Sequence, residues 1–198
     1  MRWRTNLVLA AASLIGSVLL AELVLAVLAP QIVRAPRVWQ HDAQLGWWHR
    51  PGARGRLVQP ELRVEIAINA HGLRGPEVAL EALPGTRRVA LFGDSFAEGW
   101  GVEEHETLRA RLEALRRDRG EPVEVLNFGV AGDGTDQALL AFAKRGAAFR
   151  PDVVALLFFT NDLWDNGNQR GIGGRGRLVP KPYFRAPPGG VLVLGGVP

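Results

Sequence analysis

Three apolar runs of this 198-residue chain each end in polar residues that could take part in one reaction. The first run ends at Gly93-Asp94-Ser95, the second leads into the glycine-rich segment 127–134, and the third ends before Asn161. A serine hydroxyl can attack a carbonyl carbon, and a backbone N–H or a carboxamide can donate to the oxygen that becomes negative. These residue types therefore predict acyl-transfer chemistry, with Ser95 as the nucleophile.

The elements that would position these residues alternate between strand and helix. Short apolar runs predict strands, and apolar residues at helical spacing predict helices between them. The expected strands are residues 89–92, 123–128 and 153–159, and the expected helices are 103–119 and 133–149. This alternation predicts an α/β fold with a parallel sheet and helices on both faces. The seven-residue run 153–159 is apolar throughout, which is typical of a central parallel strand.

Each helix carries an apolar stripe that should face the sheet. In the first helix the stripe consists of Leu108, Leu112 and Leu115, and in the second it includes Leu139 and Phe142. The carboxyl ends of parallel strands meet at one edge of a sheet, where the active residues of such folds lie. Ser95, a glycine N–H and the Asn161 side chain are therefore expected to meet at that edge.

In the order of these motifs, the sequence resembles the SGNH hydrolases, also called GDSL-type esterases and lipases. These proteins have a flavodoxin-like three-layer α/β fold. Gly93-Asp94-Ser95 is similar to the block that carries the family's nucleophile. Gly132 matches the oxyanion glycine of the second block, and Asn161-Asp162 matches the third block, whose asparagine is a further oxyanion donor. The resemblance implies that Ser95, Gly132 and Asn161 are the catalytic residues and that no cofactor or metal is needed.

The fourth block of the family, Asp-x-x-His, does not follow Asn161, and no histidine lies beyond His105. That block supplies the general base, so the chain as it stands is expected to be a poor catalyst. Two interpretations are open: a product truncated before this block, favoured by the abrupt end at Pro198, or a variant without its base. His105 is expected to be a solvated residue of a first helical turn.

The amino terminus predicts a membrane segment. Residues 7–29 are almost wholly apolar and, at about 1.5 Å per residue, would span a hydrocarbon layer of roughly 30 Å. Arg2 and Arg4 favour a cytoplasmic amino terminus, with the remainder on the periplasmic side. We expect an uncleaved signal-anchor, and the alternative is a signal peptide cleaved after Ala29.

The sequence divides into a signal-anchor (1–29), a lead-in with short β elements (30–86) and the hydrolase domain (87–198). Within the lead-in, residues 41–51 are expected to be loop, and residues 62–68 alternate as a half-buried strand does. Trp47 and Trp48 either pack the lead-in against the main domain or touch lipid headgroups. Residues 166–177 are expected to be loop by composition, and the apolar pieces after them are expected to form a hairpin.

Composition excludes several classes of function. The absence of cysteine excludes disulfides and thiolate sites, and a net charge of +4 without a basic block argues against nucleic acid as a partner. The expected function is a serine esterase for O-acetyl glycans or lipids at the cell envelope. The alternatives are O-acetyl transfer to a polysaccharide and a non-catalytic envelope-binding module.

Overall fold

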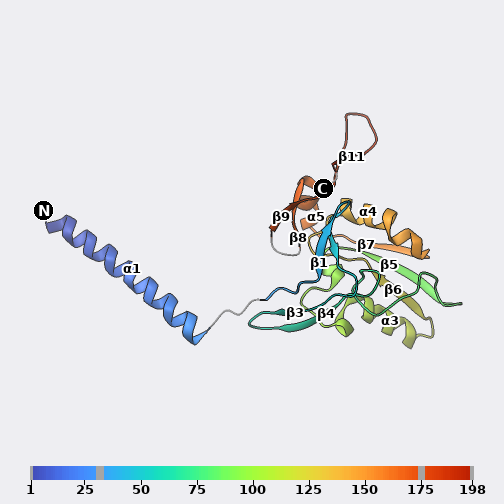
Figure 1. Cartoon of the computed structure of the whole chain (residues 1–198), viewed down its shortest axis with the longest axis horizontal. Helices are drawn as coiled ribbons and strands as arrows, with labels where there is room; N and C mark the ends of the chain where they lie inside the picture. The colour runs from blue at the N-terminus through green and yellow to red at the C-terminus, as the bar shows by residue number, and fades with distance from the viewer. Residues whose placement is uncertain (1, 30–33, 174–176, 197–198) are drawn as a thin grey trace.

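The computed structural model describes residues 2–29, 34–173 and 177–196. Its first element, α1 (Arg2–Leu28), is a 27-residue helix with no buried side chain. At 1.5 Å per residue the helix is about 40 Å long, and Figure 1 shows it standing apart from the other elements. It is long and apolar enough to cross a membrane, although a signal sequence near the amino terminus has the same properties. The predicted apolar span is thus a candidate transmembrane helix.

The lead-in begins with a hairpin where a loop was expected. β1 (Trp39–Asp42) pairs antiparallel with β2 (Gly46–His49), and the Asp42 side chain accepts the Leu45 N–H in the turn. The prediction was wrong because every residue of β2 is buried, so the strand lacks the alternation that marks a half-exposed strand. The Trp47 indole donates to the Ala131 carbonyl at 3.1 Å, which confirms that this segment packs against the main domain.

A second hairpin follows, formed by β3 (Arg54–Val58) and β4 (Arg63–Ala67). In β4, Val64 and Ile66 are buried and their neighbours are more exposed, as the alternating sequence predicts. Buried residues of the lead-in and of the main sheet form one continuous hydrophobic cluster. The lead-in is therefore packed onto the α/β domain.

The main sheet has three parallel strands in the order β6-β5-β7. The strands are β5 (Arg87–Gly93), β6 (Val123–Asn127) and β7 (Val153–Leu157), and the helices between them are α3 (Leu108–Asp118) and α4 (Thr135–Lys144). Short helical turns complete this part: α2 (Ser95–Glu98), η1 (Glu104–Glu106) and η2 (Gly146–Phe149).

Alternate residues of β5 contribute to two different clusters. Phe92 packs in the cluster that contains Ala141 of α4, and Leu91 packs in the cluster that Leu112 of α3 covers. Figure 1 shows α4 and α3 on opposite sides of the sheet. The structure thus confirms the predicted α/β architecture, with helices on both faces of a parallel sheet.

The prediction that the third strand is central was wrong for the described residues, in which β7 is an edge strand. Val153, Val154 and Leu156 are 38%, 48% and 51% exposed. An apolar run of this kind normally has partners on both sides, but the described part of the chain pairs only one side of β7, with β5.

The helical stripes are also less buried than predicted. Leu112 packs on the sheet, but Leu108 and Leu115 are 45% and 49% exposed, and Leu139 of α4 is 54% exposed. The described sheet is three strands wide, so it covers only part of each helix. The residues that α4 buries are smaller or polar: Asp136, Gln137, Ala138 and Ala141.

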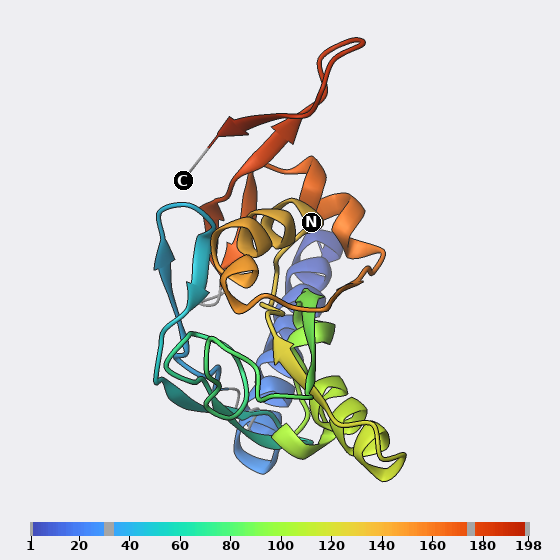
Figure 2. The ribbon, with the colours of Figure 1, turned by 90° about the vertical axis from the view of Figure 1, so that its right-hand side faces the viewer.

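The carboxyl-terminal part contains α5 (Asn161–Gly167) and two hairpins, β8 (Arg170–Gly173) with β9 (Arg177–Pro180), and β10 (Tyr183–Arg185) with β11 (Val193–Gly196). The second hairpin was predicted, and Figure 2 shows its tip projecting beyond the rest. The first contradicts the loop expected over 166–177, of which residues 174–176 lie outside the described residues. A Cβ on Gly171 would lie 2.5 Å from the Trp47 ring, so this glycine permits close strand packing.

Candidate active site

Ser95 is placed by a sharp turn at the end of the central strand. Gly93 ends β5 with a φ of +146°, and a Cβ there would lie 2.7 Å from the Leu157 carbonyl oxygen, so the turn requires glycine. Asp94 caps α2 by accepting the Phe96 N–H at 2.9 Å, so its role at this turn is structural. Ser95 is half-buried as the first residue of α2, and its hydroxyl has no hydrogen bond within the described ranges.

Asn161 follows the neighbouring strand β7 and is the first residue of α5. Its Nδ2 donates to Oδ2 of Asp94 at 2.9 Å and to Oδ2 of Asp165 at 3.0 Å. The structure therefore brings Asn161 to the turn that carries Ser95. Both amide hydrogens are engaged by carboxylates, however, whereas the resemblance implies a donor that faces the substrate oxygen. Its Oδ1 is buried and has no partner among the described residues.

Gly132 lies in the turn after β6 with a φ of +81°. A Cβ there would lie 2.7 Å from the Ile172 carbonyl oxygen and 3.5 Å from the Trp47 ring. Gly132 is thus enclosed by β8 and the lead-in. Its connection to the serine turn passes through its neighbour Ala131, whose N–H donates to Oε2 of Glu98 in α2 at 2.5 Å.

Sequence reasoning missed three buried polar residues around the serine turn. Glu98 and His49 are fully buried, and Arg74 is 1% exposed. Arg74 donates to the carbonyl oxygens of Gly99 at 2.5 Å and Val102 at 2.6 Å, and burial lowers the pKa of its guanidinium. No sequence pattern indicates these contacts. The only signal in the sequence is Glu98, a charged residue three positions after Ser95.

Residues 91–180 match the model of the GDSL-like lipase/acylhydrolase family, and this segment contains the turn of Ser95, the loop of Gly132 and the start of α5. This segment of the chain is similar to the family.

The solved structures that resemble this GDSL-like domain include AlinE4, an SGNH-hydrolase family esterase. It is 28% identical over 42% of this chain and 45% of that chain, with a TM-score of 0.35. Two variants of the same esterase are each 27% identical over 43% of this chain and 46% of theirs, with TM-scores of 0.36 and 0.35. The chain therefore spans less than half the length of these esterases. No match was found among curated proteins.

Carboxylates are concentrated beside the candidate active site of the GDSL-like domain. Burial and the nearby Asp136 raise the pKa of Asp133 well above its ordinary range, and burial raises the pKa of Asp165. Lys181 pairs with Asp136 and donates to the Asp165 carbonyl oxygen at 3.0 Å. No group of three histidine, aspartate or glutamate side chains within the described ranges is arranged to hold a metal ion.

The Asp162 side chain accepts the Phe159 N–H at 2.7 Å. Burial raises the pKa of this carboxyl group, and that hydrogen bond opposes the rise. Asp162 therefore fixes the turn between β7 and α5 from which Asn161 projects.

The four histidines lie elsewhere. His41 and His105 are exposed, His71 packs edge-on against Phe149, and His49 is buried against Glu98. The exposure of His105 agrees with its predicted role as a solvated residue. Within the described residues no histidine is hydrogen-bonded to Ser95.

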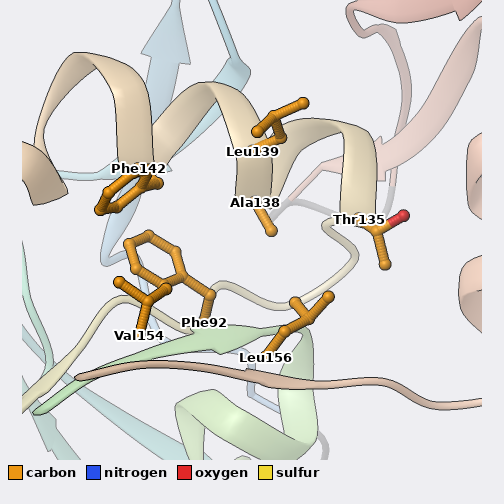
Figure 3. Close-up of a pocket in the computed structure, with 7 residues that line it drawn as sticks. All are labelled: Phe92, Thr135, Ala138, Leu139, Phe142, Val154 and Leu156. Carbon is orange, nitrogen blue, oxygen red and sulfur yellow. The ribbon is translucent and has the colours of Figure 1, made fainter.

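An apolar cavity of about 170 Å³ lies between α4 and the sheet. Its lining residues are Phe92, Thr135, Ala138, Leu139, Phe142, Val154 and Leu156. Figure 3 shows the Thr135 hydroxyl turned away from this cavity. The hydroxyl accepts a hydrogen bond from the Asn166 side chain at 2.7 Å. This cavity offers no titratable group and is therefore not the candidate active site.

Proposed function

We propose that the protein is a serine hydrolase of carboxylic esters, with Ser95 as its nucleophile. The observation that carries this proposal is that Ser95 follows the carboxyl end of the central strand and that Asn161 is hydrogen-bonded to Asp94, the residue directly before Ser95. The match of residues 91–180 to the GDSL-like lipase/acylhydrolase family supports esterase or acylhydrolase activity in general.

In the proposed reaction, the Ser95 oxygen attacks the ester carbonyl carbon while its proton passes to a base. The alcohol then leaves with a proton, and water hydrolyses the acyl-enzyme to the free acid. The Ser95 and Gly132 N–H groups and the Asn161 amide would stabilise the oxyanion. Asn161 can do this only if one of its two N–H bonds turns away from Asp94 or Asp165.

The proposed reaction also needs a base for the Ser95 proton, and no histidine among the described residues is hydrogen-bonded to Ser95. The resemblance to SGNH hydrolases implies an Asp-x-x-His histidine, which does not occur after Asn161 in this sequence. A serine that keeps its proton is a weak nucleophile, so the proposed reaction requires a base within reach of Ser95.

The candidate transmembrane helix α1 supports a substrate at the cell envelope. We propose O-acetylated glycans or lipid esters as substrates, with the catalytic domain on the periplasmic side. The same acyl-enzyme could pass its acyl group to a polysaccharide hydroxyl instead of water, which would make the protein an O-acetyltransferase. These reactions use the same site, and only the acceptor differs.

A non-catalytic envelope-binding module is the second candidate. It is favoured by the absence of a histidine hydrogen-bonded to Ser95 among the described residues. Such a module would keep the fold and the surface around Ser95 and would bind an acylated glycan without cleaving it.

Hydrolysis of p-nitrophenyl acetate by the intact protein, together with labelling by a fluorophosphonate probe, tests the proposal. The esterase should turn over the ester and label at Ser95, and Ser95→Ala should abolish both. Ser17→Ala, which removes a hydroxyl from α1, should leave both unchanged. Activity that survives Ser95→Ala would remove Ser95 from its role. Neither turnover nor labelling, with retained binding to an acetylated glycan, would favour the binding module.

A further inference from the structure

Glu98 is a buried carboxylate that the proposed reaction does not use. It is the last residue of α2, three positions after Ser95, and is 0% exposed. Its Oε2 accepts the Ala131 N–H at 2.5 Å, and its Oε1 lies 3.3 Å from Nε2 of His49. One side chain therefore touches the loop after β6 and the lead-in strand β2.

A buried carboxylate has to be matched by partners, because its removal from water is costly. An apolar residue in the same position would avoid this cost. Packing alone therefore does not explain a glutamate at this position. Its contact with Ala131 suggests a function, because Ala131 directly precedes Gly132, whose N–H is a proposed oxyanion donor.

The backbone around Glu98 is held equally closely. Its carbonyl oxygen accepts hydrogen bonds from Arg74 and from the Asn127 side chain, each at 3.3 Å. A Cβ on Gly129 would lie 2.3 Å from the Glu98 nitrogen, so the loop after β6 is pressed directly against α2. The position of the Glu98 side chain is therefore well determined relative to Ser95 on the same short helix.

His49 is the lead-in residue that contacts Glu98. Its Nδ1 lies 3.3 Å from the Gly72 carbonyl oxygen, and its Nε2 lies 3.3 Å from Oε1 of Glu98. Both side chains are fully buried, so Glu98 and β2 are in direct contact in the interior.

We propose that Glu98 is a positioning residue, which holds the Ala131-Gly132 peptide at a set distance from Ser95 through the Ala131 N–H. This inference rests on the proposed function, in which the Gly132 N–H stabilises the oxyanion. The lead-in takes part through His49, so β2 belongs to the support of the active site. Displacement of a donor by a fraction of an ångström weakens transition-state binding far more than substrate binding.

The test compares Glu98→Leu with Glu98→Gln in the intact protein. Leu removes the acceptor, whereas the Gln amide oxygen can still accept the Ala131 N–H. We expect Glu98→Leu to lower kcat for p-nitrophenyl acetate by about 10- to 100-fold, with KM within about twofold of the original. Glu98→Gln should stay within about threefold in kcat, which a purely electrostatic role would not allow.

Amide hydrogen exchange at Ala131 provides a second readout that does not depend on activity. Exchange should accelerate at least about tenfold in Glu98→Leu and change little in Glu98→Gln, because a hydrogen-bonded amide exchanges only when it opens. If Glu98→Leu does not fold, Glu98→Asp, which keeps the charge but withdraws the acceptor, should change kcat and exchange in the same directions.

Glu113 is the matched control. It is a carboxylate on α3 that accepts the Val125 N–H at 2.8 Å, so Glu113→Leu removes the same kind of bond away from the serine turn. It should leave kcat unchanged.

Three results would overturn the positioning role: a kcat unchanged in Glu98→Leu, equal losses in Leu and Gln, or unchanged exchange at Ala131. If the unchanged protein is as inactive as its Ser95→Ala variant, the proposed function is refuted, and Glu98 then has no catalytic role to support. The exchange data would then still show whether the Glu98–Ala131 bond holds the loop.

Discussion

The side-chain nitrogen of Asn161 lies 2.9 Å from Oδ2 of Asp94, the residue that directly precedes Ser95. This bond joins the turns after two neighbouring strands, β5 and β7. Because a second carboxylate, Asp165, lies 3.0 Å from the same nitrogen, the orientation of the amide is fixed with its oxygen facing away from both. The two carboxylates therefore determine whether Asn161 can reach a substrate.

The first prediction concerns the Asn161 amide, whose two hydrogens are bound by Asp94 and Asp165. Asn161→Ala should lower kcat for p-nitrophenyl acetate by about 10² to 10³, the usual cost of one oxyanion donor. Asp165→Ala, which frees one of the two hydrogens, should stay within about threefold of the original or exceed it. Steady-state kinetics of the two variants decide this. Equal losses would show that Asp165 itself takes part in the reaction.

Asp133 should make folding stability fall as pH rises. Burial raises its pKa in the folded protein well above that of the unfolded chain, so its favourable contribution is complete below the unfolded pKa of about 4. That contribution is lost as pH rises through the folded value. Asp133→Asn removes this dependence and keeps an oxygen for the Gln137 amide, which lies 3.1 Å from Oδ1.

Urea unfolding of the original protein and of its Asp133→Asn variant, at pH 5 and pH 8, provides the measurement. We expect Asp133→Asn to raise the free energy of unfolding at pH 8 by roughly 1–2 kcal/mol, with a smaller gain at pH 5. A variant that is less stable at both pH values would contradict the assignment.

Arg74 should be a large contributor to the stability of the serine turn. It donates to the carbonyl oxygens of Glu98, Gly99 and Val102, so Arg74→Leu leaves three acceptors without this donor. The free energy of unfolding should fall by about 3 kcal/mol or more. Arg56→Leu is the control, because the Arg56–Glu65 pair is exposed and should contribute nothing measurable. Urea midpoints give both values, and similar effects of the two changes would refute the prediction.

Helix α1 should anchor the protein in a membrane. The product should pellet with membranes after carbonate extraction at its uncleaved mass, and deletion of residues 2–28 should release it. Mass spectrometry of the membrane fraction checks the amino terminus. A soluble product that begins near residue 30 would show that α1 is a cleaved signal sequence.

The sequence by itself determined the parts of this protein that depend on local patterns. The alternation of apolar runs and helical segments predicts the parallel sheet, and Gly93-Asp94-Ser95 predicts the turn at the end of β5, because glycine, cap and strand residues act on their immediate neighbours. The apolar character of residues 7–29 predicts α1 for the same reason.

The tertiary structure alone decided which distant residues meet. Trp47 reaches Ala131 across 84 positions of the chain, and Glu98 reaches both Ala131 and His49. Even the edge position of β7 follows from which strands pair rather than from its own apolar run. Such contacts arise from the packing of whole elements, and the residues that make them, a buried glutamate and a buried histidine, have no local pattern to mark them.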